Sequence, residues 1–177
     1  MIGFIQITRE VLRRRLRSGV PTAIMPGGIL EMFRTRYGRI DISLDHLGAL
    51  HIAYEARRAV YPVYAANVSD LWWCWHPIPR LSEWMRSRFR VGFPCFFLPV
   101  LKLPPNLYLH VGRSIKPEEH PHIESYIEAY FSGMCIMAQK YRRPHQKLYL
   151  WKNDVAFEVA RGAGITGIQG MVRKILQ

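Results

Sequence analysis

The feature that most limits how this chain can fold is one long amphipathic segment, residues 121–141. Acidic Glu118 and Glu119 precede it, basic Lys140 ends it, and Pro144 prevents its continuation. Its apolar side chains recur at helical spacing at Ile123, Ile127, Tyr130, Met134, Met137 and Tyr141. We therefore predict a helix over 121–141 that packs against the rest of the protein.

Shorter elements precede this helix and alternate in type. A helix is predicted over 5–18, with Thr8 as its N-cap and Gly19 at its end. The other predicted elements are a strand at 22–25, a short helix at 29–33, a helix at 47–56, and strands at 59–65 and 107–111. Alternating helices and strands are typical of the α/β class. We expect a mixed sheet with flanking helices, in which the strands near Thr22, Val60 and Leu107 belong to one sheet.

The charge of the chain indicates an anionic partner. It carries 25 Lys and Arg against 13 Asp and Glu, a net charge of +12. Nucleic acid, an anionic membrane surface and a phosphate-bearing molecule all suit that balance, as does a merely solvated basic surface. Trp72, Trp73 and Trp75 suit a membrane interface, a core or stacking on single-stranded nucleic acid. Since no RNA-binding signature is present, nucleic acid is not the expected partner.

The cysteines argue against a disulfide scaffold, and the longest apolar run is too short for a membrane-spanning helix. Cys74, Cys95 and Cys135 are widely spaced and form no CxxC pair, so we predict small buried side chains in a reducing compartment. The run 91–101 is interrupted by Pro94 and Pro99 and is about half the ~20 residues that a membrane-spanning helix needs. It is expected to lie on a membrane or to form a buried loop.

The candidate binding motif is Pro26-Gly27-Gly28-Ile29-Leu30-Glu31, directly after the predicted strand at 22–25. Paired glycines let a backbone turn tightly and approach a ligand closely. A helix that begins there would direct free N–H groups at an anion. An ordinary strand-to-helix turn is the other interpretation.

Several motifs occur in an order that resembles a known enzyme family. They are Thr8-Arg9-Glu10, Pro26 to Glu31, Tyr61-Pro62-Val63-Tyr64, Val111-Gly112-Arg113-Ser114-Ile115 and the helix at 121–141. This order is similar to that of the type-2 diacylglycerol and monoacylglycerol acyltransferases, within the glycerolipid acyltransferase superfamily. The resemblance covers residues 1–143.

The resemblance implies an O-acyltransferase of neutral glycerolipid synthesis, which moves an acyl group from acyl-CoA to mono- or diacylglycerol. It implies the cytoplasmic face of the endoplasmic reticulum membrane, with acyl-CoA, glycerolipid and the membrane surface as partners. Acyl-CoA is the substrate and no cofactor is expected. Substrate contacts would come from Pro26, Gly27, Gly28 and Glu31. Residues 1–146 would form a partial acyltransferase domain and 147–177 a C-terminal extension.

The sequence departs from the family at its catalytic motif. The family's His-Pro-His-Gly, a form of the superfamily's His-x-x-x-x-Asp box, precedes the Gly-Gly turn, and neither pattern occurs in these 177 residues. We therefore assign no catalytic residue and expect the chain to be a fragment or a divergent member of the family, inactive alone. The alternative is a non-catalytic basic module that binds anionic membrane lipid or RNA.

One short sequence imitates the missing motif. His120-Pro121-His122 lacks the glycine, follows the Gly-Gly turn and stands at a predicted helix start, where proline is favoured. We do not assign it a catalytic role. A metal site formed by these two histidines and His110 is not expected either, because only their spacing suggests it.

Overall fold

A computed structural model describes residues 8–24, 36–70, 72–75, 84, 88, 96–99 and 106–177. Its main sheet has the strand order β1-β6-β7, formed by β1 (Arg39–Ser43), β6 (Lys147–Lys152) and β7 (Val155–Val159). β1 runs parallel to β6, whereas β7 pairs antiparallel with β6. The predicted class, an α/β protein with a mixed sheet and flanking helices, is confirmed at this level.

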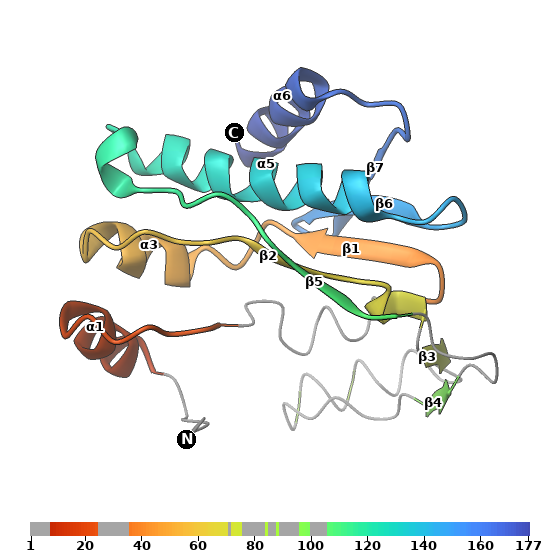
Figure 1. Ribbon diagram of the computed structural model, residues 1–177, viewed down its shortest axis with the longest axis horizontal. Helices are drawn as coiled ribbons and strands as arrows, with labels where there is room; N and C mark the ends of the chain where they lie inside the picture. Colours follow the sequence, from red (N-terminus) through yellow and green to blue (C-terminus); the bar gives the residue numbers. More distant parts are fainter. Residues whose placement is uncertain are drawn as a thin grey trace.

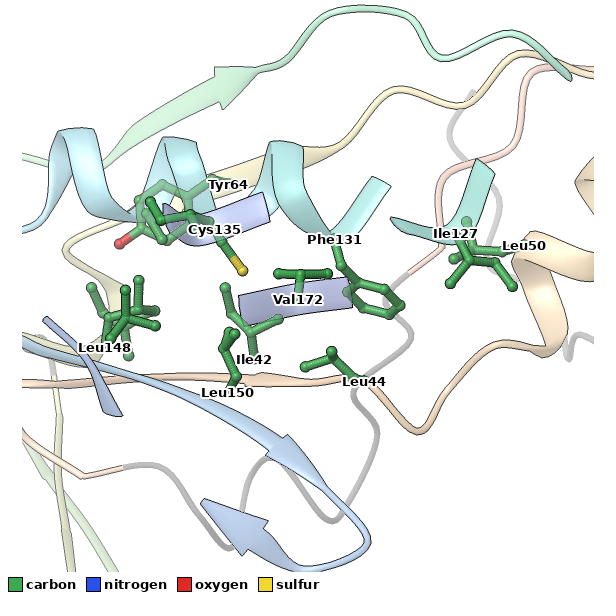
Figure 2. Packing of buried hydrophobic residues seen from close by; sticks show 14 of the residues in the cluster. Ile42, Leu44, Leu50, Tyr64, Ile127, Phe131, Cys135, Leu148, Leu150 and Val172 are labelled. Atoms are coloured by element: carbon green, nitrogen blue, oxygen red, sulfur yellow. The ribbon is translucent and has the colours of Figure 1, made fainter. Parts of the chain in front are cut away.

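Two helices cover one face of the main sheet (Figure 1). They are α5 (Ile123–Tyr141), predicted from the sequence, and α6 (Ile165–Leu176). Between helices and sheet lies the apolar cluster of Figure 2, which includes Ile42, Leu44, Phe131, Cys135, Leu148, Leu150 and Val172. Deleting a buried leucine side chain of this kind costs about 2–5 kcal/mol. The cluster therefore holds together elements that are far apart in the sequence.

A second, two-stranded sheet lies beside α5. β2 (Val63–Ala66) pairs antiparallel with β5 (Tyr108–Val111), and a bridge between Val60 and Ile115 extends the pair. The strands predicted at 59–65 and 107–111 are thus confirmed as partners. Alternation along β2 places Tyr64 and Ala66 in the core, where Tyr64 lies near Cys135 (Figure 2).

The remaining elements are shorter. α3 (Gly48–Glu55), predicted at 47–56, supplies Leu50 to the core. The short helix η1 (Val68–Asp70) follows β2, and η2 (Pro117–Glu119) precedes α5. β3 (Trp72–Trp75) and β4 (Phe96–Pro99) pair antiparallel.

The N-terminal helix α1 (Arg9–Arg17) packs on α3, and both of its ends are capped. Thr8 is the N-cap as predicted, and its side chain accepts a hydrogen bond from the Val11 amide at 3.3 Å. At the other end, Arg58 donates to the carbonyl oxygens of Leu16 at 2.8 Å and Arg17 at 3.2 Å. Gly19, with φ +75°, leaves the helix in the left-handed conformation.

Two predictions about the sheets are corrected. Residues 22–24 form no strand, so the expected single sheet that joins them to the segments at 60 and 107 does not exist. Ile24 is exposed, and without a partner strand a short apolar run gains little from an extended conformation. Residues 147–177, which the sequence left without elements, supply β6, β7 and α6 to the common core. Whether they act as a separate functional extension stays a prediction.

Candidate functional site

The predicted substrate-contact residues Pro26, Gly27, Gly28 and Glu31 lie outside the described residues, as does the helix predicted at 29–33. Their role stays a prediction. The other motifs of the family resemblance lie within the described residues.

Two of these motifs meet backbone to backbone. The amide of Gly112 donates to the carbonyl oxygen of Pro62 at 2.8 Å, and Val63 is in register with Val111. A Cβ on Gly112 would lie 2.8 Å from Cγ of Pro62 and 3.1 Å from Cε of Met137. Any larger residue at this crossing of β5 against β2 under α5 would require Pro62 or Met137 to shift. The strand, the glycine segment and the helix are therefore one packed unit.

Two ionisable groups are buried in this unit. Burial, followed by the charge of Asp70, raises the pKa of Tyr64 to about 12. Burial alone raises the pKa of Cys135 to about 12. Both groups stay protonated at neutral pH, so neither is suited to act as a nucleophile there.

The outward face of β2 and β5 is apolar. Leu109 is 71% exposed and Val111 63% exposed, and both lie on the side of the strands opposite Tyr64. We call this surface the apolar face; its exposed members are Tyr61, Val63, Leu107, Leu109 and Val111. A contiguous group of exposed apolar side chains is typical of a surface that binds another molecule or a lipid phase.

A pocket lies on the outward face of the main sheet, at the start of β1 and β6. Its volume is about 400 Å³. We call it the basic pocket; it is lined by Arg36, Tyr37, Gly38, Arg39, His145, Lys147 and Tyr149. The parallel pairing of Arg39 with Lys147 brings together two segments more than a hundred residues apart in the sequence. Gly38, with φ +69°, makes the turn that leads into β1.

Arg39 is held from two sides in this pocket. Its Nε donates to Oδ1 of Asp41 at 2.8 Å. Its guanidinium carbon lies 4.1 Å from the ring centre of Tyr149 and 5.2 Å from that of Trp151. These contacts fix the plane of the guanidinium group. In the described part of the chain, its two terminal nitrogens have no hydrogen-bond partner.

His145, at the edge of the basic pocket, is also fixed. Its Nε2 lies 3.1 Å from Oδ2 of Asp70, a residue that is 3% exposed. A carboxylate oxygen accepts, so Nε2 donates in the tautomer that hydrogen-bonds to Asp70. Tyr37 stacks on the imidazole, with ring centres 5.7 Å apart. The second oxygen of Asp70 is buried and has no hydrogen-bond partner within the described residues.

The histidines of the imitated motif lie elsewhere. His122 is the N-cap of α5 and makes no side-chain capping bond, while the ring of His120 meets the edge of Tyr126 with centres 6.0 Å apart. His110 stacks on Tyr141, with ring centres 3.5 Å apart. Across the described residues, no group of three His, Cys, Asp or Glu side chains is placed to hold a metal ion.

The basic pocket was not predicted from the sequence. The sequence contains two signals for the segments that form the pocket. The glycine of Tyr37-Gly38 favours a turn, and the alternation in Lys147–Lys152 favours a strand. Neither signal reveals that the two segments pair.

Among the helices of the described ranges, none combines the length and apolar character that crossing a bilayer requires. Comparisons of the chain with protein-family models, with curated proteins and with solved structures found no match.

Proposed function

We propose that this chain is part of an acyl-CoA-dependent O-acyltransferase of neutral glycerolipid synthesis, working on mono- or diacylglycerol at the cytoplasmic face of the endoplasmic reticulum. The observation that carries the proposal is the packing of three motifs into one unit. The Tyr61-Pro62-Val63-Tyr64 strand, the Gly112 segment and helix α5 meet at the contact of Gly112 with Pro62 and Met137. In the resemblance, these motifs also follow one another in this order.

The apolar face gives independent support. A substrate such as diacylglycerol reaches a protein from a lipid phase, so an enzyme that uses it needs an apolar surface open to that phase. Leu109 and Val111 are among the most exposed large apolar side chains in the described residues. α1 lies beyond α3 from α5 (Figure 1), and the apolar face is the side of β2 and β5 opposite the buried Tyr64. Arg9, Arg13, Arg14 and Arg17 of α1 are exposed, and anionic lipid attracts such charges.

In the proposed chemistry, a histidine acts as general base on the acceptor hydroxyl, whose oxygen attacks the carbonyl carbon of the acyl-CoA thioester. The C–S bond then breaks, the histidine returns the proton to the departing CoA sulfur, and the products are the acylglycerol ester and CoA thiol. Free N–H donors stabilise the oxyanion that forms. No described residue is assigned these roles. We propose that this chain contributes substrate binding, in which Gly27, Gly28 and Glu31 contact the substrate.

A second candidate function is a non-catalytic module that binds anionic membrane lipid. The combination of the apolar face with the exposed arginines of α1 favours it, because interfacial proteins join these two features. The same surface favours lipid over RNA, since the exposed apolar side chains of β5 have no use against a phosphate backbone.

The experiment that tests the proposed function is binding of oleoyl-CoA to the 177-residue chain, followed by tryptophan fluorescence. We expect saturable binding that Glu31→Gln weakens several-fold. The matched control is Glu10→Gln, which removes the same charge from an exposed position in the first turn of α1 and should leave binding unchanged.

Two results would count against the proposal. One is absence of saturable oleoyl-CoA binding, and the other is equal binding by the Glu31→Gln and wild-type chains. Transfer of oleoyl groups to diacylglycerol that is lost in His122→Ala would contradict our assignment of no catalytic residue.

A further inference from the structure

We propose that the basic pocket binds a nucleoside diphosphate, with the phosphate oxygens on Arg39 and Lys147 and the base against Tyr37. The binding of this group stands on the pocket alone. Naming CoA, which contains such a group, as its natural carrier rests on the proposed function.

Arg39 is oriented in advance for a phosphate group. Contacts with Asp41 and Tyr149 hold its guanidinium in one orientation, and its terminal nitrogens make no hydrogen bond to any described residue. A planar fork of donors that is already oriented matches two phosphate oxygens and loses little entropy on binding. A surface arginine without such contacts would lack this advantage.

The residues that line the pocket carry positive charge. Arg36, Arg39 and Lys147 line it, and no carboxylate is among the lining residues. Among the described residues, Asp41 holds Nε of Arg39, Asp70 holds His145, and the carboxylate of Glu158 lies 3.9 Å from the Lys147 ammonium group. The Lys147–Glu158 pair is exposed and therefore weak, so a phosphate can replace Glu158 as the partner of Lys147.

The aromatic edge of the pocket indicates a nucleotide rather than a bare phosphate. Tyr37 is 46% exposed and stacks with one face on His145. Because buried Asp70 fixes the His145 ring, Tyr37 rests on a rigid support. A nucleobase can stack on such an exposed ring, and stacking of this kind does not depend on base identity.

The size of the pocket agrees with this ligand. Its volume of about 400 Å³ is near the lower end of the roughly 300–1,000 Å³ of ordinary ligand pockets. The phosphorylated head of a ligand fits such a space, whereas a whole acyl-CoA would extend out of it. The long apolar chain would then lie elsewhere on the protein.

The test is a titration of the full chain with ADP by calorimetry, with adenosine 3′,5′-diphosphate, CoA, inorganic phosphate and glycerol 3-phosphate as comparison ligands. We expect one saturable site for ADP. Arg39→Lys keeps the charge but loses the fork, and should weaken ADP binding roughly tenfold. Lys147→Gln should weaken it several-fold. Tyr37→Ala should weaken ADP binding while it leaves inorganic phosphate binding unchanged.

Lys116→Gln and Lys174→Gln are the matched controls, because both remove an exposed charge outside the pocket. The inference is overturned if these controls weaken ADP binding as much as the pocket variants do, which would show attraction by net charge alone. It is also overturned if inorganic phosphate or glycerol 3-phosphate binds as tightly as ADP. Oleoyl-CoA binding that depends on Glu31 but not on Arg39 would overturn the naming of CoA as the natural carrier and leave the proposed function standing.

Discussion

Asp70 and His145 are joined across 75 positions of sequence by a contact of 3.1 Å between Oδ2 and Nε2. Asp70 ends η1 after β2, and His145 lies in the turn before β6, so the contact ties the two sheets together. The same turn is held by Gln146, whose amide donates to the Ser69 hydroxyl at 3.3 Å.

Asp70→Asn should destabilise the protein. The charge of Asp70 is buried, and Arg143, at 3.8 Å, and His145 are its partners. Loss of a hydrogen bond to a charged group costs about 1.5–3 kcal/mol. We expect a decrease of that size in the free energy of unfolding, measured with urea. The control is Glu124→Gln, at an exposed position, whose free energy of unfolding should stay within about 0.5 kcal/mol of the wild-type value. If Asp70→Asn also had a negligible effect, the buried contact would be refuted.

Gly112→Ala should also destabilise the protein, because the new Cβ would lie 2.8 Å from Cγ of Pro62. Overpacking of this kind costs about 1–3 kcal/mol. The measurement is the thermal midpoint. Gly170→Ala is the control, since nothing lies within 4 Å of the new Cβ on α6. The Gly170→Ala variant should be stabilised by about 0.5–1 kcal/mol. A Gly112→Ala chain as stable as the wild type would mean that Gly112 and Pro62 are not in contact.

Stability should decrease at alkaline pH. The pKa of Cys135 and that of Tyr64 are both raised to about 12 by burial, whereas in the unfolded chain they are near 9 and 10. Their contribution is fully present below about pH 9 and is lost as the pH rises toward 12, because only the unfolded chain then ionises freely. Urea midpoints at neutral pH and at several alkaline values measure this. The urea midpoint of the Cys135→Ala variant should decrease less steeply with pH than that of the wild type. A wild-type midpoint that does not change above pH 9 would contradict the burial of both groups.

Binding to anionic vesicles should depend on the apolar face. Leu109→Glu places a charge where the side chain is 71% exposed and would enter the lipid, so flotation with vesicles of phosphatidylcholine and phosphatidylserine should decrease several-fold. Arg14→Glu should reduce the preference for phosphatidylserine, since each basic residue near the surface contributes about 1 kcal/mol.

Ile165→Glu is the control for Leu109→Glu, because Ile165 is similarly exposed, at 60%, but begins α6 on the other side of α5. It should float with vesicles as the wild type does. If instead Leu109→Glu left flotation unchanged and converted a dimer to a monomer, the apolar face would be a contact between copies of the chain and the lipid prediction would be wrong.

The elements predicted correctly are those whose local pattern and tertiary packing agree. α5 has charged ends and apolar spacing, and β2 and β5 have apolar runs that find each other as partners. The strand predicted at 22–25 had the apolar run, but residues 22–24 have no pairing strand. α6 was missed because Gly167 and Gly170 lower helix propensity, and packing of Ile168 and Val172 in the core outweighs that cost.

The basic pocket could not be predicted for a different reason. Its residues come from a turn at 36–39 and a strand at 147–152, and only the parallel pairing of β1 with β6 unites them. Parallel pairing leaves no local signal comparable to a hairpin turn. The residues predicted for substrate binding, at 26–31, lie outside the described part of the chain. Their role is tested by ligand binding and by photolabelling.

The most direct measurement of the central claim is photolabelling with an acyl-CoA that carries a photoreactive group on its acyl chain, followed by mapping of the labelled peptides. The account predicts labels within 26–31 and along the apolar face at Leu109 and Val111, reduced by excess unlabelled oleoyl-CoA. Labels confined to β7 and α6, or labels that excess oleoyl-CoA does not reduce, would contradict it.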